Sequence, residues 1–85
     1  MTYTVQMTRR ARRGLADLTG DMHQHVREAI VGLATNPRPT GCMKLTGREG
    51  WRIRVGDYRI LYTINDDARL VTVVDVGHRR EIYRA

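Results

Sequence analysis

The fold is decided by the stretch Trp51-Arg52-Ile53-Arg54-Val55-Gly56-Asp57-Tyr58-Arg59-Ile60-Leu61-Tyr62. Its two halves alternate apolar and polar side chains and are rich in β-branched and aromatic residues, which is typical of strands. Gly56-Asp57 separates the halves, and a two-residue loop that begins with glycine suits a type II′ turn, because glycine takes a positive φ at little cost. The stretch therefore predicts a β-hairpin.

The register of this hairpin divides its side chains between two faces, because residues that pair across the strands share a face. One face is predicted to belong to the core; it holds Trp51, Ile53, Val55, Tyr58, Ile60 and Tyr62. The other face is basic; it holds Arg52, Arg54 and Arg59 beside Leu61. Arg54 is placed directly opposite Arg59, and like charges in such a pair destabilise a sheet.

Two interpretations of the basic face are open. A solvated basic strand face is the ordinary one, since exposed charges contribute little to stability. Alternatively, the three arginines form a polyanion site, because planar guanidinium groups fit phosphate better than the point charge of lysine does.

Length, charge and cysteine content narrow the class of protein. Residues 1–85 are expected to form a single domain. The net charge is +6 and 14 of the 15 cations are arginine, which favours nucleic acid or an acidic protein segment as partner. No apolar run approaches the roughly 20 residues of a membrane span, and the first residues lack the basic-then-apolar pattern of a signal peptide, so membrane attachment is not expected. The single Cys42 excludes an internal disulfide and a cysteine-based zinc site, so we expect a cytoplasmic protein.

The N-terminal half predicts a strand and a helical hairpin. Residues 2–7 alternate as in a short strand, and Thr8 is a suitable N-cap for the helix that follows. Gly20 is expected to end this helix and Asp21 to cap the second one. The apolar stripes of the two helices are Ala11, Leu15 and Leu18, then Met22, Val26, Ala29, Ile30 and Leu33. The remaining faces of the first helix carry Arg9, Arg10, Arg12 and Arg13, interpreted as solvated or as a second phosphate-contacting surface.

The C-terminal half predicts strands. After a loop over residues 36–41, the hairpin extends through Ile64, and residues 69–76 are expected to form a central strand, which Gly77 is expected to end. The expected fold is α+β, a two-layer sandwich made of an N-terminal strand, a helical hairpin, a three-stranded antiparallel meander and a short C-terminal tail. The basic face would then lie on the side of the sheet away from the helices.

The chain resembles the RelE toxin family, within the RelE/ParE superfamily of bacterial and archaeal type II toxin–antitoxin systems. The resemblance runs from Tyr3 to Tyr83. It is carried by the order and spacing of four segments, residues 44–47, 51–55, 56–59 and 76–83.

The resemblance implies a set of site residues. The paired basic residues before the hairpin turn fall on Arg52 and Arg54, the arginine after the turn on Arg59, the arginine after the Val-Gly break on Arg79 and the late tyrosine on Tyr83. The same segments supply Lys44 and Arg80 as expected RNA contacts. The implied activity is ribosome-dependent cleavage of mRNA in the A site, by attack of a ribose 2′-OH without metal or other cofactor, which leaves a 2′,3′-cyclic phosphate and inhibits translation.

The chemistry assigns roles within this set. Attack by a 2′-OH needs a base and stabilisation of a pentacovalent phosphorane, and Arg59 and Arg79 suit the second task. The best-known form of the family has lysines at the strand pair, whereas arginine does not lose its proton, so Arg52 and Arg54 are predicted to clamp phosphate. Tyr83 is the predicted general base, its pKa lowered by nearby arginines, with His78 as a possible additional residue.

The expected partners follow from the same resemblance. They are an acidic RelB-like antitoxin, the 70S ribosome and mRNA, with operator DNA reached only through the antitoxin and no membrane. Two alternatives are a ParE-like toxin that inhibits gyrase and a non-catalytic basic module that binds nucleic acid or an antitoxin.

Overall fold

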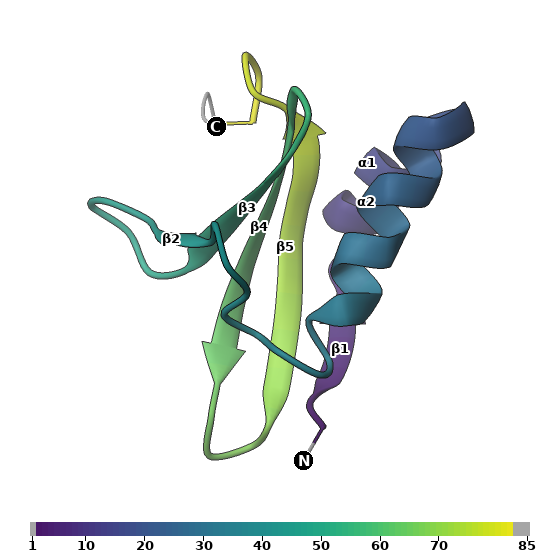
Figure 1. Cartoon of the computed structure of the whole chain (residues 1–85). Coiled ribbons are helices and arrows are strands. Elements are labelled where there is room, and N and C mark those ends of the chain that lie inside the picture. The colour runs from purple at the N-terminus through teal and green to yellow at the C-terminus, as the bar shows by residue number, and fades with distance from the viewer. Residues whose placement is uncertain (1, 83–85) are drawn as a thin grey trace.

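The chain folds into a five-stranded sheet, and two helices cover one face of this sheet (Figure 1). The structure, a computed structural model, describes residues 2–82. Its elements are β1 (Thr4–Met7), α1 (Arg9–Ala16), α2 (Gly20–Gly32), β2 (Met43–Lys44), β3 (Trp51–Val55), β4 (Tyr58–Asn65) and β5 (Leu70–His78). The strand order is β1-β5-β4-β3-β2, with β1 parallel to β5 and the other neighbours antiparallel. The predicted α+β two-layer fold with its antiparallel meander is confirmed.

The central hairpin has the predicted register. Arg54 pairs with Arg59 and Trp51 with Tyr62 across β3 and β4. Gly56 has a φ of +58°, whereas Asp57 has no positive φ, which is the pattern of a type II′ turn. The turn thus relies on glycine at its first position.

The core lies between the helices and the helical face of the sheet. The predicted stripes of α1 and α2 pack there against inward side chains of β3, β4 and β5. Tyr62 is 1 % exposed, and its hydroxyl donates to the carbonyl of Pro37 at 2.8 Å. Burial raises the pKa of this phenol, with a further contribution from Cys42. The bond ties the loop before β2 to the core.

Helix α1 lies unusually close to β5. Its N-cap Thr8 accepts a hydrogen bond from the Ala11 amide at 3.1 Å and donates to the carbonyl of Val74 at 2.7 Å. A Cβ on Gly14 would lie 2.1 Å from the carbonyl oxygen of Val76. Only glycine allows this approach.

Four features differ from the sequence prediction, and two of them are helix boundaries. Helix α1 ends at Ala16 rather than at Gly20, because the amides of Asp17 and Leu18 already close its last turn. Thr19 is the N-cap of α2, and Asp21 lies in the first turn instead. There its carboxylate interacts favourably with the positive end of the helix dipole.

The other two differences concern strands. Gly77 does not end β5, because it pairs with Arg59 and the ladder continues to His78. The short strand β2 was not predicted; it pairs Met43 with Arg52, and two residues are too few to show an alternating pattern.

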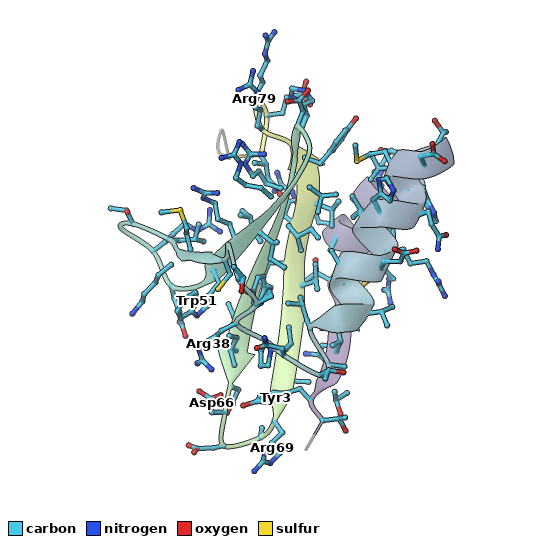
Figure 2. All side chains as sticks on the ribbon, in the orientation of Figure 1. Tyr3, Arg38, Trp51, Asp66, Arg69 and Arg79 are labelled. Carbon is cyan, nitrogen blue, oxygen red and sulfur yellow. The ribbon has the colours of Figure 1, made fainter. Side chains whose placement is uncertain are left out.

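A polar cluster fastens the end of the sheet that lies farthest from Arg79 (Figure 2). Arg38 donates to both carboxylate oxygens of Asp66, at 3.3 and 2.9 Å, and stacks over Trp51 at 5.3 Å. The Tyr3 hydroxyl donates to the same carboxylate at 2.6 Å. The bonds from Arg38 and Tyr3 lower the pKa of Asp66 to about 2. Within residues 2–82, neither helix has the length and apolarity to cross a membrane.

Candidate functional site

The face of the sheet turned away from the helices carries the predicted site. We call it the arginine face and define it by Arg52 and Arg54 of β3 and Arg59 of β4. The hairpin register brings the three together, since Arg54 and Arg59 are direct partners and Arg52 lies two residues away on the same side of β3.

Arg59 is the most fixed of the three. It is 8 % exposed, and its Nη1 donates to the carbonyls of Gly56 and Tyr58 at 3.2 and 3.0 Å. Within residues 2–82 it forms no ion pair with a carboxylate. A buried cation held by neutral carbonyls keeps its full charge in a defined position, which is the arrangement needed to stabilise an anion.

Arg54 and Arg52 are freer. Arg54 is exposed opposite Arg59. Arg52 is half-buried; its Nη2 lies 3.0 Å from the sulfur of Met43, a weak acceptor, and its buried Nη1 has no acceptor among residues 2–82. Burying a donor without an acceptor costs about 1–3 kcal/mol. An anion bound to the Arg52 guanidinium would supply the missing acceptor and recover this free energy.

Arg79 joins the site through the hairpin turn. It follows β5, and its amide donates to the carbonyl of Asp57 at 2.8 Å while its Nε lies 3.7 Å from the carboxylate of the same residue. Figure 2 shows Arg79 at the end of the molecule where the turn lies. The structure therefore brings the four predicted arginines to one region.

A bulge in β5 decides which side chains accompany them. The pairing between β4 and β5 shifts by one residue after Leu61, so that Leu61 faces Asp75 but Tyr62 faces Val73. The shift reverses the alternation along the end of β5. Gly77 consequently shares the arginine face with its partner Arg59.

A small apolar patch lies under the arginines. Leu61, the partner of Arg52, is 2 % exposed. Ile82 is 4 % exposed and its Cβ would lie 3.5 Å from a Cβ on Gly77. The chain returns to this face because the amides of Glu81 and Ile82 both donate to the carbonyl of His78. This patch excludes water, and the lower local dielectric constant strengthens the electric field of the neighbouring arginines.

Tyr83 lies outside the residues that the structure describes. Its assignment as general base therefore stays a prediction.

His78 is on the other side of the sheet. It pairs with Tyr58, and the two rings meet edge to face at 5.5 Å between centroids. Its Nδ1 accepts the amide of Arg80 at 3.1 Å. The imidazole borders a cavity of about 400 Å³ between α1 and the end of β5. The structure thus does not bring His78 together with the arginines.

The two expected RNA contacts, Lys44 and Arg80, are both exposed. Lys44 pairs with Trp51, on the face opposite to Arg52 in the register of β2 and β3. It nevertheless borders, with Arg52, a cavity of about 280 Å³ to which Arg48 also contributes. Sequence reasoning missed Arg48, because it lies in a connection without strand or helix periodicity.

The four arginines of the predicted site can supply electrostatics but not proton transfer. Arginines can hold a phosphate and stabilise a phosphorane, but they do not titrate at accessible pH. Among residues 2–82, no group of three or more histidine, cysteine, aspartate or glutamate side chains is placed to bind a metal ion.

Comparison with known proteins identifies the class. The family of the ParE toxin of the type II toxin–antitoxin system parDE matches residues 5–83. The chain therefore belongs to this toxin family, and the resemblance to RelE toxins within the RelE/ParE superfamily is confirmed by its relatives.

Three relatives illustrate the similarity. Toxin RelG of Mycobacterium tuberculosis (strain ATCC 25618 / H37Rv) is 39 % identical over 99 % of both chains. A chain of the toxin–antitoxin complex RelBE2 from Mycobacterium tuberculosis superimposes with a TM-score of 0.79 at 34 % identity, covering 93 % of this chain and 100 % of that one. The archaeal RelE–RelB complex from Pyrococcus horikoshii OT3 gives a TM-score of 0.82 at 26 % identity, covering 100 % of both.

Proposed function

We propose that this type II toxin is a ribosome-dependent endoribonuclease, which cleaves mRNA in the A site and inhibits translation in the cytoplasm. The observation that carries the proposal is the arginine face. Within residues 2–82, Arg59 is buried and fixed without a carboxylate partner, Arg54 lies directly opposite, and Arg79 is bound to the same turn. Preorganised cations of this kind suit a reaction in which negative charge builds up on phosphorus.

The reaction we propose is transfer within the RNA strand. The 2′-oxygen of the nucleotide before the cut forms a bond to phosphorus, and the bond from phosphorus to the 5′-oxygen of the next nucleotide breaks. The base takes the proton of the 2′-hydroxyl and the leaving 5′-oxygen takes one proton from solvent, so that the products are a 2′,3′-cyclic phosphate and a 5′-hydroxyl with no net proton release. Arg59 and Arg79 stabilise the phosphorane, while Arg54 and Arg52 hold the phosphate in line.

Proton transfer is assigned to Tyr83 on the basis of the family resemblance. Among the residues that match the family's site, Tyr83 alone can take up the proton of the 2′-hydroxyl, because arginine is always protonated. Positive charge nearby would favour the phenolate. His78 is the second candidate, but it lies on the helical face, and the sheet separates it from the arginine face.

The proposed regulator is an acidic antitoxin of the RelB type. The solved relatives from Mycobacterium tuberculosis and Pyrococcus horikoshii are toxin–antitoxin complexes. With a net charge of +6, this chain would attract an acidic partner over a distance, and association should slow as salt screens the charges. Operator DNA would be reached through the antitoxin.

The test is to add the purified toxin to translating ribosomes and map the mRNA ends by primer extension. New ends within A-site codons, which disappear when the cognate antitoxin is added first, are expected. Arg54→Gln is the loss-of-activity control. A parallel supercoiling assay with gyrase tests the alternative activity; gyrase inhibition with intact mRNA would overturn the proposal.

A further inference from the structure

The cavity beside β2 is separate from the turn where Arg54, Arg59 and Arg79 gather. It has a volume of about 280 Å³ and lies between β2 and the connection that leads into β3. Its lining residues are Met43, Lys44, Leu45, Thr46, Arg48 and Arg52. Three of the six are cations and none is a carboxylate, so the cavity presents positive charge alone.

The connection that forms its outer wall is anchored at its base. The Leu45 amide donates to the carbonyl of Gly50 at 2.9 Å, which closes the loop over residues 45–50. Gly50 has a φ of +123°, and a Cβ there would lie 2.9 Å from the carbonyl oxygen of Tyr62. Figure 1 shows this connection projecting from the sheet on the side away from the helices. The cavity is therefore built on a closed loop that the sheet holds in place.

The cations around the cavity have no acidic partner in the part of the chain that the structure describes. Neither Lys44 nor Arg48 takes part in an ion pair or a side-chain hydrogen bond within residues 2–82. Among the same residues, the Arg52 side chain reaches only the sulfur of Met43, and its Nη1 finds no acceptor. Unbalanced guanidinium groups around one concave site indicate an anionic ligand.

The position of the cavity points to the backbone of RNA. Arg52 borders it and also belongs to the arginine face, where Arg54 follows two residues along β3, about 6.6 Å away. This spacing resembles the separation of successive phosphates in an extended strand. A strand whose reacting phosphate lies between Arg54 and Arg59 would thus bring a neighbouring phosphate past Arg52 toward Arg48.

We propose that this cavity is a second phosphate site, which binds a backbone phosphate of single-stranded RNA flanking the cut, with Arg48 as its own ligand and Arg52 shared with the reacting phosphate. The proposal rests on the proposed endoribonuclease function, which it extends from one phosphate to a strand. An acidic segment of the antitoxin is the competing occupant, and the experiment separates the two.

The experiment measures how RNA binding by the whole chain depends on salt. The probes are 2′-O-methyl oligouridylates of two and six nucleotides, which cannot be cleaved because the attacking hydroxyl is blocked. The variant is Arg48→Gln. The matched control is Arg27→Gln, which removes the same charge from an exposed position on α2, on the other side of the sheet. Thermal melts establish that both variants fold.

For the hexamer, each phosphate contact adds about 0.7 to the slope of log K against log salt. Arg48→Gln is expected to lower this slope by about 0.7 and to leave dinucleotide binding unchanged, because a single phosphate does not reach the cavity. Arg27→Gln should match the parent with both probes. A hexamer slope that is equal in the two variants overturns the second site. So does a variant that keeps hexamer binding but loses antitoxin affinity, since the cavity then serves the antitoxin.

Cleavage by the parent on ribosomes separates this inference from the proposed function. If the unsubstituted protein cuts no mRNA but its hexamer-binding salt slope falls in Arg48→Gln, the proposed nuclease activity is refuted and the second phosphate site stands. A parent that cuts mRNA while the slope is insensitive to Arg48 refutes the second site alone.

Discussion

Replacing Arg59 should affect both cleavage and stability, whereas replacing Arg54 should affect cleavage only. The two arginines are cross-strand partners with the same charge, yet Arg54 is exposed and Arg59 is 8 % exposed with two hydrogen bonds to backbone carbonyls. Glutamine keeps the polarity and much of the length while removing the charge. Arg54→Gln and Arg59→Gln are therefore a matched pair.

The magnitudes follow from these contacts. Loss of one positioned electrostatic group costs about two to three orders of magnitude in rate, so we expect that loss in single-turnover cleavage for each variant. Hydrogen bonds from a charged donor contribute about 1.5–3 kcal/mol. The lower end applies to Arg59, because the carbonyl of the exposed Gly56 can bind water instead and repulsion from Arg54 is relieved. About 1.5 kcal/mol corresponds to a fall in Tm of roughly 6–12 °C for a domain of this size.

The assay combines cleavage on a programmed ribosome with thermal melts followed by circular dichroism. Arg54→Gln should melt within about 4 °C of the parent, since substitutions at exposed sites usually change stability by less than about 0.5 kcal/mol. Parental cleavage by Arg54→Gln would show that the reacting phosphate lies elsewhere. An unchanged Tm for Arg59→Gln would show that its two carbonyl contacts do not stabilise the hairpin.

Three further outcomes are expected. Tyr83→Phe should bind ribosomes and lose roughly a hundredfold to ten-thousandfold in single-turnover cleavage across pH, with His78→Ala affected less; the reverse order would make His78 the base. Asp66 has a folded pKa of about 2, below its unfolded value of about 3.9, so its contribution to stability is present above about pH 4 and is lost as the pH falls toward 2. In Asp66→Asn, the free energy of unfolding in urea should depend less on pH between about 4 and 2. The same pH dependence as in the parent would contradict the effect. Gly14→Ala should destabilise the fold by about 1–3 kcal/mol or more, because its Cβ would overlap a carbonyl of β5 at 2.1 Å, whereas Gly32→Ala, with nothing within 4 Å, should not; equal urea midpoints would contradict the close approach.

Most of the arginine face could be predicted from the sequence because a hairpin is local. Side chains alternate along a strand with a period of two residues, and the glycine at the turn sets the register. Together they correctly predicted that Arg52, Arg54 and Arg59 share a face. Helix stripes were predictable for the same reason, since they depend on neighbours three and four residues away.

The environment of these arginines could not be predicted in that way. The bulge after Leu61 shifts the pairing with β5, and a regular alternation from Val73 would have turned Gly77 toward the helices and His78 toward the arginines. The observed shift does the opposite. No local pattern signals such a bulge, because it depends on how two distant strands fit together.

The sequence by itself determined the central hairpin and the charge of the site, because these follow from short-range periodicity and composition, and its resemblance to RelE toxins indicated the class of protein. Only the tertiary structure decided that Arg59 is fixed on the turn carbonyls, that Arg79 returns to Asp57, and that β2 and its loop build a cavity around Arg48. Each of these depends on contacts between elements far apart in the chain. Such contacts form only when the sheet closes and its buried groups must find partners.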